Sequence, residues 1–110
     1  MAAYVVVDID IKDARTYERY KAMAPASIAA YGGRYVVRGG STTTLEGDWR
    51  PGRFVILEFA SAERARAWWD SPEYAAAKAL RQSCADTDMV LTEGPAFDPA
   101  AERSTSHPAT

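Results

Sequence analysis

Apolar and polar residues alternate along several short stretches of the chain, and this period of two predicts β-strands. From Tyr4 to Ile11, valine and isoleucine occupy one face, while valine and aspartate occupy the other. The same pattern recurs over residues 34–39, 53–60 and 87–93. We therefore expect four strands, each with one face turned toward a core.

Helical segments follow the first and the third strand, because apolar residues there recur at intervals of three and four. Asp13 is the expected N-cap of the first helix, and the glycine pair at 32–33 is its expected end. Pro25 lacks a backbone N–H, so we expect it to kink or divide that helix. Ser61 is expected to begin a short helix, and Ser71, followed by proline and glutamate, another.

The resulting order of strand, helix, strand, strand, helix pair and strand is the βαββαβ pattern of the ferredoxin-like fold. We expect an α+β sandwich in which a four-stranded antiparallel sheet carries the helices on one face. The domain is expected to span residues 1–97. Residues 98–110 are rich in proline, serine and threonine, and we expect a disordered C-terminal tail there.

The second face of this sheet has no helix to cover it. Its alternating positions carry apolar residues: Val6, Val36, Phe54, Ile56 and Val90. An exposed apolar face of that extent normally marks an interaction surface, and a second copy of the chain is the simplest cover. We therefore expect a homodimer that pairs sheet against sheet around a two-fold axis.

Composition and charge exclude two classes of partner, nucleic acids and membranes. The 110-residue chain has a net charge of −2 and a pI near 5.3, whereas nucleic-acid-binding domains are basic, so we expect no nucleic-acid partner. No apolar run approaches the ~18 residues of a membrane span, and no leader segment is recognisable. We expect a cytoplasmic protein with no membrane partner.

The residues that usually carry catalysis are scarce. His107 is the only histidine and lies in the expected tail, and Cys84 is the only cysteine. Catalytic triads, typical zinc sites and histidine-bound haem therefore lack their side chains. We expect no cofactor and no metal, which leaves aspartate, glutamate, arginine, tyrosine and backbone groups for any chemistry.

Three charged residues point by alternation into the uncovered sheet face, namely Asp8, Arg38 and Glu58. The first and third strands are central in this fold, so Glu58 is expected beside both Arg38 and Asp8. In one interpretation Arg38 anchors an anionic ligand, and Glu58 or Asp8, with its pKa raised by enclosure, moves a proton. In the other, the three charges form an interface salt-bridge network that fixes the dimer register.

The long connection after the second strand supplies the remaining candidates. Gly39 and Gly40 flank the arginine strand and are counted with Arg38 and Trp49 as candidate ligand-binding residues. The loop lacks the lysine and the helix that a phosphate-binding loop needs. Trp49 is a large apolar group on a loop, and it either caps the mouth of a pocket between the sheets or packs against the sheet edge.

A family resemblance runs through several stretches of the chain: Tyr31-Gly-Gly-Arg-Tyr-Val-Val-Arg-Gly-Gly40, Leu45-Glu-Gly-Asp-Trp49, Ile56-Leu-Glu-Phe59, Ala67-Trp-Trp69, Ser71-Pro-Glu-Tyr74 and Arg81. Together they resemble the bacterial family called domain of unknown function thirteen-thirty, over roughly residues 3 to 97. The resemblance implies a ferredoxin-like protomer that pairs as a dimeric α/β barrel. That superfamily also holds cofactor-free monooxygenases, lactone isomerases and haem enzymes, so the family implies a fold and leaves the activity open.

Two functional hypotheses follow. In the first, a homodimer binds a small anionic or carbonyl-bearing molecule in the barrel between the sheets, with cofactor-free acid–base or oxygen chemistry as its activity. In the second, the chain is a non-catalytic dimeric module whose buried charges only specify pairing.

Overall fold

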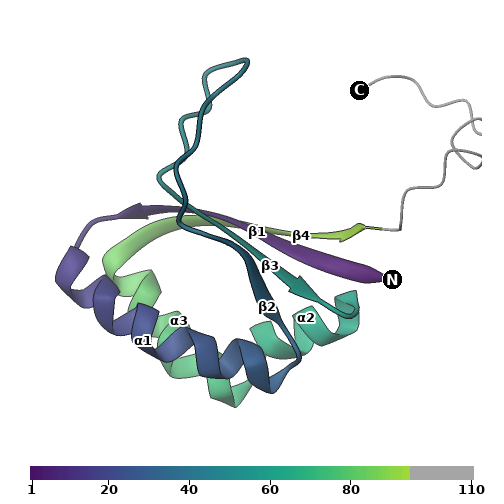
Figure 1. Ribbon diagram of the computed structural model, residues 1–110. Coiled ribbons are helices and arrows are strands. Elements are labelled where there is room, and N and C mark those ends of the chain that lie inside the picture. Colours follow the sequence, from purple (N-terminus) through teal and green to yellow (C-terminus); the bar gives the residue numbers. More distant parts are fainter. Residues whose placement is uncertain (95–110) are drawn as a thin grey trace, which may run out of the picture.

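The computed structural model of the chain describes residues 1–94 and has the expected order of elements (Figure 1). The strands are β1 (Ala2–Ile11), β2 (Arg34–Arg38), β3 (Arg53–Phe59) and β4 (Ala85–Gly94), and the helices are α1 (Ala14–Ala30), α2 (Ala62–Trp69) and α3 (Pro72–Cys84). The strands form one antiparallel sheet in the order β2-β3-β1-β4. The ferredoxin-like α+β class is confirmed. The expected domain end at residue 97 and the expected tail over 98–110 lie outside the described residues.

All three helices lie on one face of the sheet (Figure 1). On β1 the alternation is as expected: Val5, Val7 and Ile9 are buried toward the helices, whereas Val6 and Asp8 on the other face are partly exposed. The core between sheet and helices is dominated by aromatic side chains. Phe59, Trp68 and Tyr74 are the largest fully buried side chains, and together they fix how the helices pack on the sheet.

Helix α1 begins at the expected N-cap, where the Asp13 side chain accepts a hydrogen bond from the Thr16 backbone N–H. The helix continues past Pro25 to Ala30, so proline does not divide it. A kink at Pro25 stays a prediction. Two residues after the helix ends, Gly32 has a φ of +76°, the left-handed conformation that glycine adopts without a Cβ clash. Ser61 and Ser71 cap α2 and α3 as expected.

Strand β2 contains a β-bulge that the alternation did not predict. Arg34 and Tyr35 pair with Glu58 and Leu57 in regular register, but the register shifts after Tyr35, so that Arg38 pairs with the buried residue Val55. An extra residue in one strand exchanges the two faces for every residue that follows it. Arg38 therefore faces the helices, and its predicted position on the uncovered sheet face is wrong.

The sheet face opposite the helices remains uncovered in the part of the chain that the structure describes. Apolar side chains on it are unusually exposed, Val90 by 61% and Val36 by 45%. The connection between β2 and β3, residues 39–52, stands away from the sheet on this side (Figure 1). We call this segment the arm; it carries Leu45, which is 95% exposed. None of the helices in residues 1–94 is long and apolar enough to cross a membrane.

Candidate functional site

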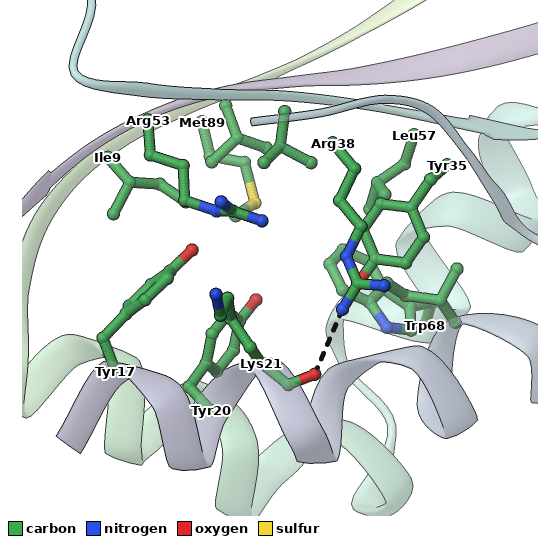
Figure 2. A pocket seen from close by; sticks show the side chains of 13 residues that line it. Ile9, Tyr17, Tyr20, Lys21, Tyr35, Arg38, Arg53, Leu57, Trp68 and Met89 are labelled. Carbon is green, nitrogen blue, oxygen red and sulfur yellow. Dashed lines mark hydrogen bonds between the residues drawn. The ribbon is translucent and has the colours of Figure 1, made fainter. Parts of the chain in front are cut away.

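A cavity lies between the sheet and α1, on the face that carries the helices (Figure 2). Its polar lining comes from three elements: Tyr17, Tyr20 and Lys21 of α1, Tyr35 and Arg38 of β2, and Arg53 of β3. Apolar strand residues and Trp68 line the rest. The cavity has a volume of about 20 Å³, which is room for about one water molecule.

The lining of this cavity is positively charged. Lys21, Arg38 and Arg53 contribute to it, and no aspartate or glutamate does. Lys21 forms an ion pair with Glu18 on the helix surface, 3.0 Å long. Arg38 and Arg53 take part in none of the ion pairs formed within residues 1–94. The cavity thus concentrates positive charge in a chain whose net charge is −2.

Arg53 reaches from the sheet into the space above α1 (Figure 2). Its guanidinium carbon lies 5.7 Å from the centre of the Tyr17 ring, and its Nε is buried without a hydrogen-bond partner. Gly39, with a φ of +74°, makes room for this side chain, because a Cβ there would collide with Arg53 Nη1. Gly39 thus shapes the site indirectly, and neither Gly39 nor Gly40 lines the cavity.

Arg38 stands at the mouth of the cavity and is held by uncharged groups. Its Nη2 donates a hydrogen bond of 3.3 Å to the backbone carbonyl of Lys21, which Figure 2 shows as a dashed line. Its guanidinium carbon lies 4.5 Å from the centre of the Tyr35 ring, in cation–π contact. Since neither partner carries a negative charge, the charge of Arg38 remains available to a ligand.

A chain of hydrogen bonds leads from a buried cation to the cavity. Arg81 is 2% exposed, and its Nε donates to the Tyr74 hydroxyl at 3.4 Å. The Tyr74 and Tyr20 hydroxyl oxygens lie 3.0 Å apart. Arginine can only donate, and Tyr74 is fully buried, so its own proton finds an acceptor only if it donates to Tyr20. The Tyr20 proton is then left for an acceptor inside the cavity.

The tyrosines of the cavity stay protonated at neutral pH. Burial raises the pKa of Tyr20 well above its ordinary value, and the neighbouring Tyr74 raises it further. Burial also raises the pKa of Tyr17 and of Tyr35, although the nearby arginines oppose the shift. These side chains therefore keep their hydroxyl protons and can donate hydrogen bonds, and none of them is a base at neutral pH.

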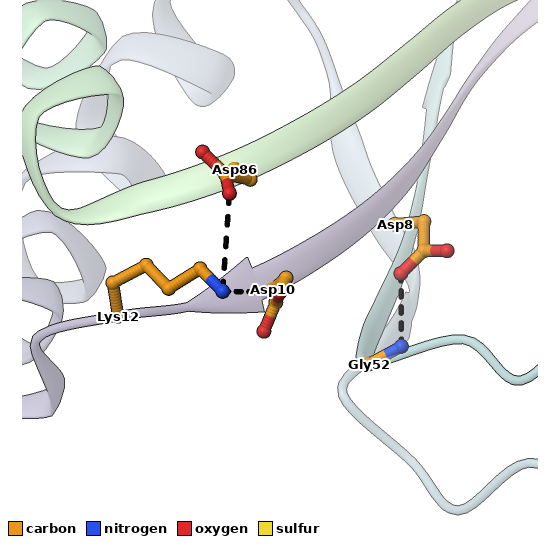
Figure 3. A network of polar contacts seen from close by, with 5 residues as sticks. All are labelled: Asp8, Asp10, Lys12, Gly52 and Asp86. Atoms are coloured by element: carbon orange, nitrogen blue, oxygen red, sulfur yellow. Dashed lines mark hydrogen bonds and ion pairs between the residues drawn. The ribbon is translucent and has the colours of Figure 1, made fainter.

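Asp8 lies on the uncovered sheet face and anchors the arm. Its Oδ1 accepts a hydrogen bond of 2.9 Å from the Gly52 backbone N–H (Figure 3), and its Oδ2 accepts one of 2.8 Å from Trp49 Nε1. The Trp49 ring packs edge-on against Phe54 of the same face, with ring centres 5.8 Å apart. These contacts support packing of Trp49 against the sheet. A role for Trp49 at the mouth of a pocket between two sheets stays a prediction.

The expected cluster of Asp8, Arg38 and Glu58 does not form. Glu58 binds Arg34 instead of Arg38, with Oε1 at 2.7 Å from Nε and 2.6 Å from Nη2, and it accepts a hydrogen bond from the Tyr4 hydroxyl. Glu58 pairs across the sheet with Tyr4, four positions along β1 from Asp8, or about 13 Å at ~3.3 Å per residue. The three residues therefore cannot act together within one protomer.

Several residues of the cavity and its hydrogen-bond chain were not predicted as site residues, among them Lys21, Arg53 and Arg81. Tyr17 and Tyr20 lie at helical spacing on the buried face of α1, and that spacing is more typical of core residues than of a ligand pocket. The sequence nevertheless contains one signal of the buried hydrogen-bond chain. Arg81 interrupts the apolar stripe of α3, and a cation at a core position requires polar partners.

The fold and this cavity define a class: a ferredoxin-like α+β protein with a cationic cavity between sheet and helices. The chain belongs to the family described as domain of unknown function (DUF1330), whose model matches residues 2–95. The predicted family is thereby confirmed. No curated protein has a sequence that matches this chain.

Several solved structures share the fold. A protein of unknown function from Rhodopseudomonas palustris is 18% identical, with a TM-score of 0.72 over 89% of this chain and 84% of that chain. SnoaB, a cofactor-independent oxygenase from Streptomyces nogalater, is 14% identical, with a TM-score of 0.61 over 89% and 97%. A dimeric ferredoxin-like protein of unknown function from a Jannaschia species is 12% identical, with a TM-score of 0.65 over 86% and 100%. At these identities the likeness shows the fold alone.

Proposed function

We propose that this protein binds a small organic anion in the cavity between the sheet and α1. The observation that carries this proposal is the charge of the lining: Lys21, Arg38 and Arg53 contribute three cations and no carboxylate lines the cavity. Lys21 is paired with Glu18 on the helix surface, whereas Arg38 and Arg53 take part in none of the ion pairs within residues 1–94. A cavity with one sign of charge and low-dielectric walls attracts the opposite charge. The ligand site therefore lies on the helix side of the sheet, whereas the sequence had suggested the space between two sheets.

The hydrogen-bond donors of the cavity favour an oxygen anion. Since Arg81 donates to Tyr74, the arrangement in which Tyr74 donates to Tyr20 leaves the Tyr20 proton for a ligand acceptor. Arg81 then strengthens Tyr20 as a donor through Tyr74. Donors arranged in this way stabilise a carboxylate, an enolate or a phenolate, because they are oriented before the charge arrives. Such a site binds a ligand that is already ionised and supplies no carboxylate to remove its proton.

The apolar surroundings indicate a ligand with a hydrophobic body. A second hollow of about 190 Å³ shares Trp68 and Met89 with the cavity and has Val5, Ala65 and Leu91 in its walls. Met89 lines both spaces, and a flexible thioether side chain moves at small cost. A shift of Met89 would join the two spaces and make room for the ring of an aromatic acid.

The reaction class that we propose to test is cofactor-free oxygenation. One structural neighbour is a cofactor-independent oxygenase, and in chemistry of that kind the substrate itself supplies the electrons to dioxygen. Stabilising the anion of the substrate keeps it in its electron-rich form. The alternative is a non-catalytic dimeric module, in which the cavity binds no ligand.

We also propose that the protein is a homodimer joined through the uncovered sheet face. The exposed valines on that face and the dimeric neighbour from Jannaschia support this assembly. Light scattering should give twice the chain mass of 12.0 kDa. Val90→Glu, which places a charge on the face, should shift the mass toward that of a monomer. A wild-type monomer at micromolar concentration would contradict the dimer.

Calorimetry with a matched pair of probes tests the ligand site. We expect 4-hydroxybenzoate to bind and 4-hydroxybenzamide, its uncharged analogue, to bind at least about tenfold more weakly, because the amide cannot pair with the cations. Arg53→Met keeps the apolar stem and removes the charge, and it should weaken acid binding about tenfold.

Arg34→Met is the matched control, because Arg34 is an exposed arginine of the same sheet that pairs with Glu58. It should bind the acid as the wild type does. Equal affinity for acid and amide, or an equal loss in the two variants, would contradict the proposed site.

A further inference from the structure

Pro25 leaves one carbonyl of α1 without its usual partner. In a continuous α-helix the carbonyl of residue 21 accepts from the N–H of residue 25, and proline has no N–H to donate. Helix α1 nevertheless runs unbroken from Ala14 to Ala30. The Lys21 carbonyl is thus free on the side of the helix that borders the cavity, and Arg38 Nη2 donates to it.

A second irregularity brings Arg38 to that carbonyl. Without the bulge in β2, Arg38 would point to the uncovered face, away from α1. The register shift after Tyr35 turns it toward the helices. A proline inside a helix costs stability, and a bulge disrupts the hydrogen-bond ladder of a strand. The hydrogen bond from Arg38 to the Lys21 carbonyl depends on both irregularities and lies beside the cavity.

The hydrogen bond to the Lys21 carbonyl orients the Arg38 guanidinium without neutralising its charge. Arg34, on the same strand, is paired with Glu58, so a ligand anion would have to compete with that carboxylate. Arg38 is fixed by a neutral carbonyl and by the Tyr35 ring. One of its five N–H groups is used, which leaves a pair that can hold a carboxylate in bidentate fashion.

We propose that Pro25 is a positioning residue for ligand binding: its missing N–H frees the Lys21 carbonyl, which holds Arg38 ready at the cavity mouth for a carboxylate ligand. This inference rests on the proposed function and names the ligand group that Arg38 takes. An arginine ordered before binding loses less side-chain entropy when the ligand arrives.

Pro25→Ala tests the proposal, because alanine returns the helical N–H and offers the Lys21 carbonyl its ordinary donor. Pro72→Ala is the matched control. Pro72 occupies the first turn of α3, where an N–H has no helical acceptor, so its replacement frees or fills no carbonyl. The melting temperature of Pro25→Ala should equal or exceed that of the wild type, since proline disfavours a helix interior.

The first readout needs no ligand. The Nε–H of Arg38, assigned by its loss in Arg38→Lys, should show restricted motion by ¹⁵N relaxation in the wild type and in Pro72→Ala, and free motion in Pro25→Ala. Equal order of Arg38 in all three proteins would overturn the positioning role, whatever the protein binds.

The second readout uses 4-hydroxybenzoate as the probe. Pro25→Ala should weaken binding about fivefold, in proportion to the loss of an ordered arginine, while Pro72→Ala leaves it unchanged. Unchanged affinity in Pro25→Ala would overturn the inference and leave the anion site standing. Failure of the wild type to bind the acid would overturn the proposed function, and the relaxation measurement would still decide whether Pro25 positions Arg38.

Discussion

Replacing Arg81 by methionine should make the protein more stable and a poorer anion binder. Arg81 is 2% exposed, has an Nη2 without any hydrogen-bond partner and takes part in none of the ion pairs within the described residues. Burying an ion costs several kcal/mol even after relaxation. Methionine has a similar length and fills the same space without a charge.

The expected gain follows from the balance of these terms. The hydrogen bond to Tyr74 returns about 1.5–3 kcal/mol, and the position of Arg81 in the last turn of α3 adds about 0.3–1 kcal/mol. Apolar replacement of buried ion pairs is neutral to stabilising by about 1–4 kcal/mol, and Arg81 lacks even a carboxylate partner within the described residues. We expect a gain of about 1–3 kcal/mol, which raises the melting temperature by at least about 4 °C in a domain of this size.

Thermal melting and calorimetry check the two halves of this prediction. The melting temperature should rise in Arg81→Met, while affinity for 4-hydroxybenzoate falls about threefold or more, because Tyr20 loses the cation behind it. Arg66→Met, the same change at an exposed position of α2, should change stability by less than about 0.5 kcal/mol. A fall of several degrees in Arg81→Met would refute the reasoning, since it would show that the buried charge is compensated.

Three further predictions concern other contacts. Burial raises the pKa of Tyr20 above the ordinary value of 10.0, so the protonated Tyr20 contributes to the free energy of unfolding below pH 10, and this contribution is lost as pH rises above 10. Tyr20→Phe should therefore lessen the loss of melting temperature at alkaline pH. An alkaline profile equal to that of the wild type would contradict this prediction. Gly39→Ala should cost about 1–2 kcal/mol for its positive φ and should also weaken anion binding by displacing Arg53, whereas a fully stable variant with normal binding would show that neither constraint holds. Asp8→Ala should release the arm, because Asp8 accepts hydrogen bonds from Trp49 and Gly52. The Trp49 fluorescence should then be red-shifted and quenched faster than in the control variant Asp10→Ala. Identical Trp49 spectra in the two variants would show that Asp8 does not hold the arm.

The sequence patterns were most informative where a local rule decides the structure. The alternation in β1 and the caps at Asp13 and Ser71 depend on neighbouring residues, and all three are as predicted. The placement of Arg38 failed because a bulge depends on how β2 pairs with β3, and the five residues of β2 alone do not reveal it. Alternation of apolar and polar residues assigns each side chain to a face of the sheet, but it does not determine where along the sheet that side chain lies.

The same limit explains why the charged cluster predicted from the sequence does not form. Asp8 and Glu58 do share a face, but the register places them four positions apart along β1. Tyr17 and Tyr20 fit the apolar pattern of a core helix and are indeed buried, so the pattern could not show that their hydroxyls meet cations. The contact of Arg38 with the Lys21 carbonyl needs both the proline in α1 and the bulge in β2. The sequence shows the proline, but it does not show the bulge.

The location of a bound anion tests the central claim most directly. In a ¹⁵N–¹H titration of the wild-type protein with 4-hydroxybenzoate, the account predicts saturable shifts at Tyr17, Lys21 and Arg53 around the cavity. Asp8 and Glu58, on the opposite face of the sheet, should change little. Shifts centred on Asp8 and Glu58, or equal shifts with 4-hydroxybenzamide, would contradict an anion site between the sheet and α1.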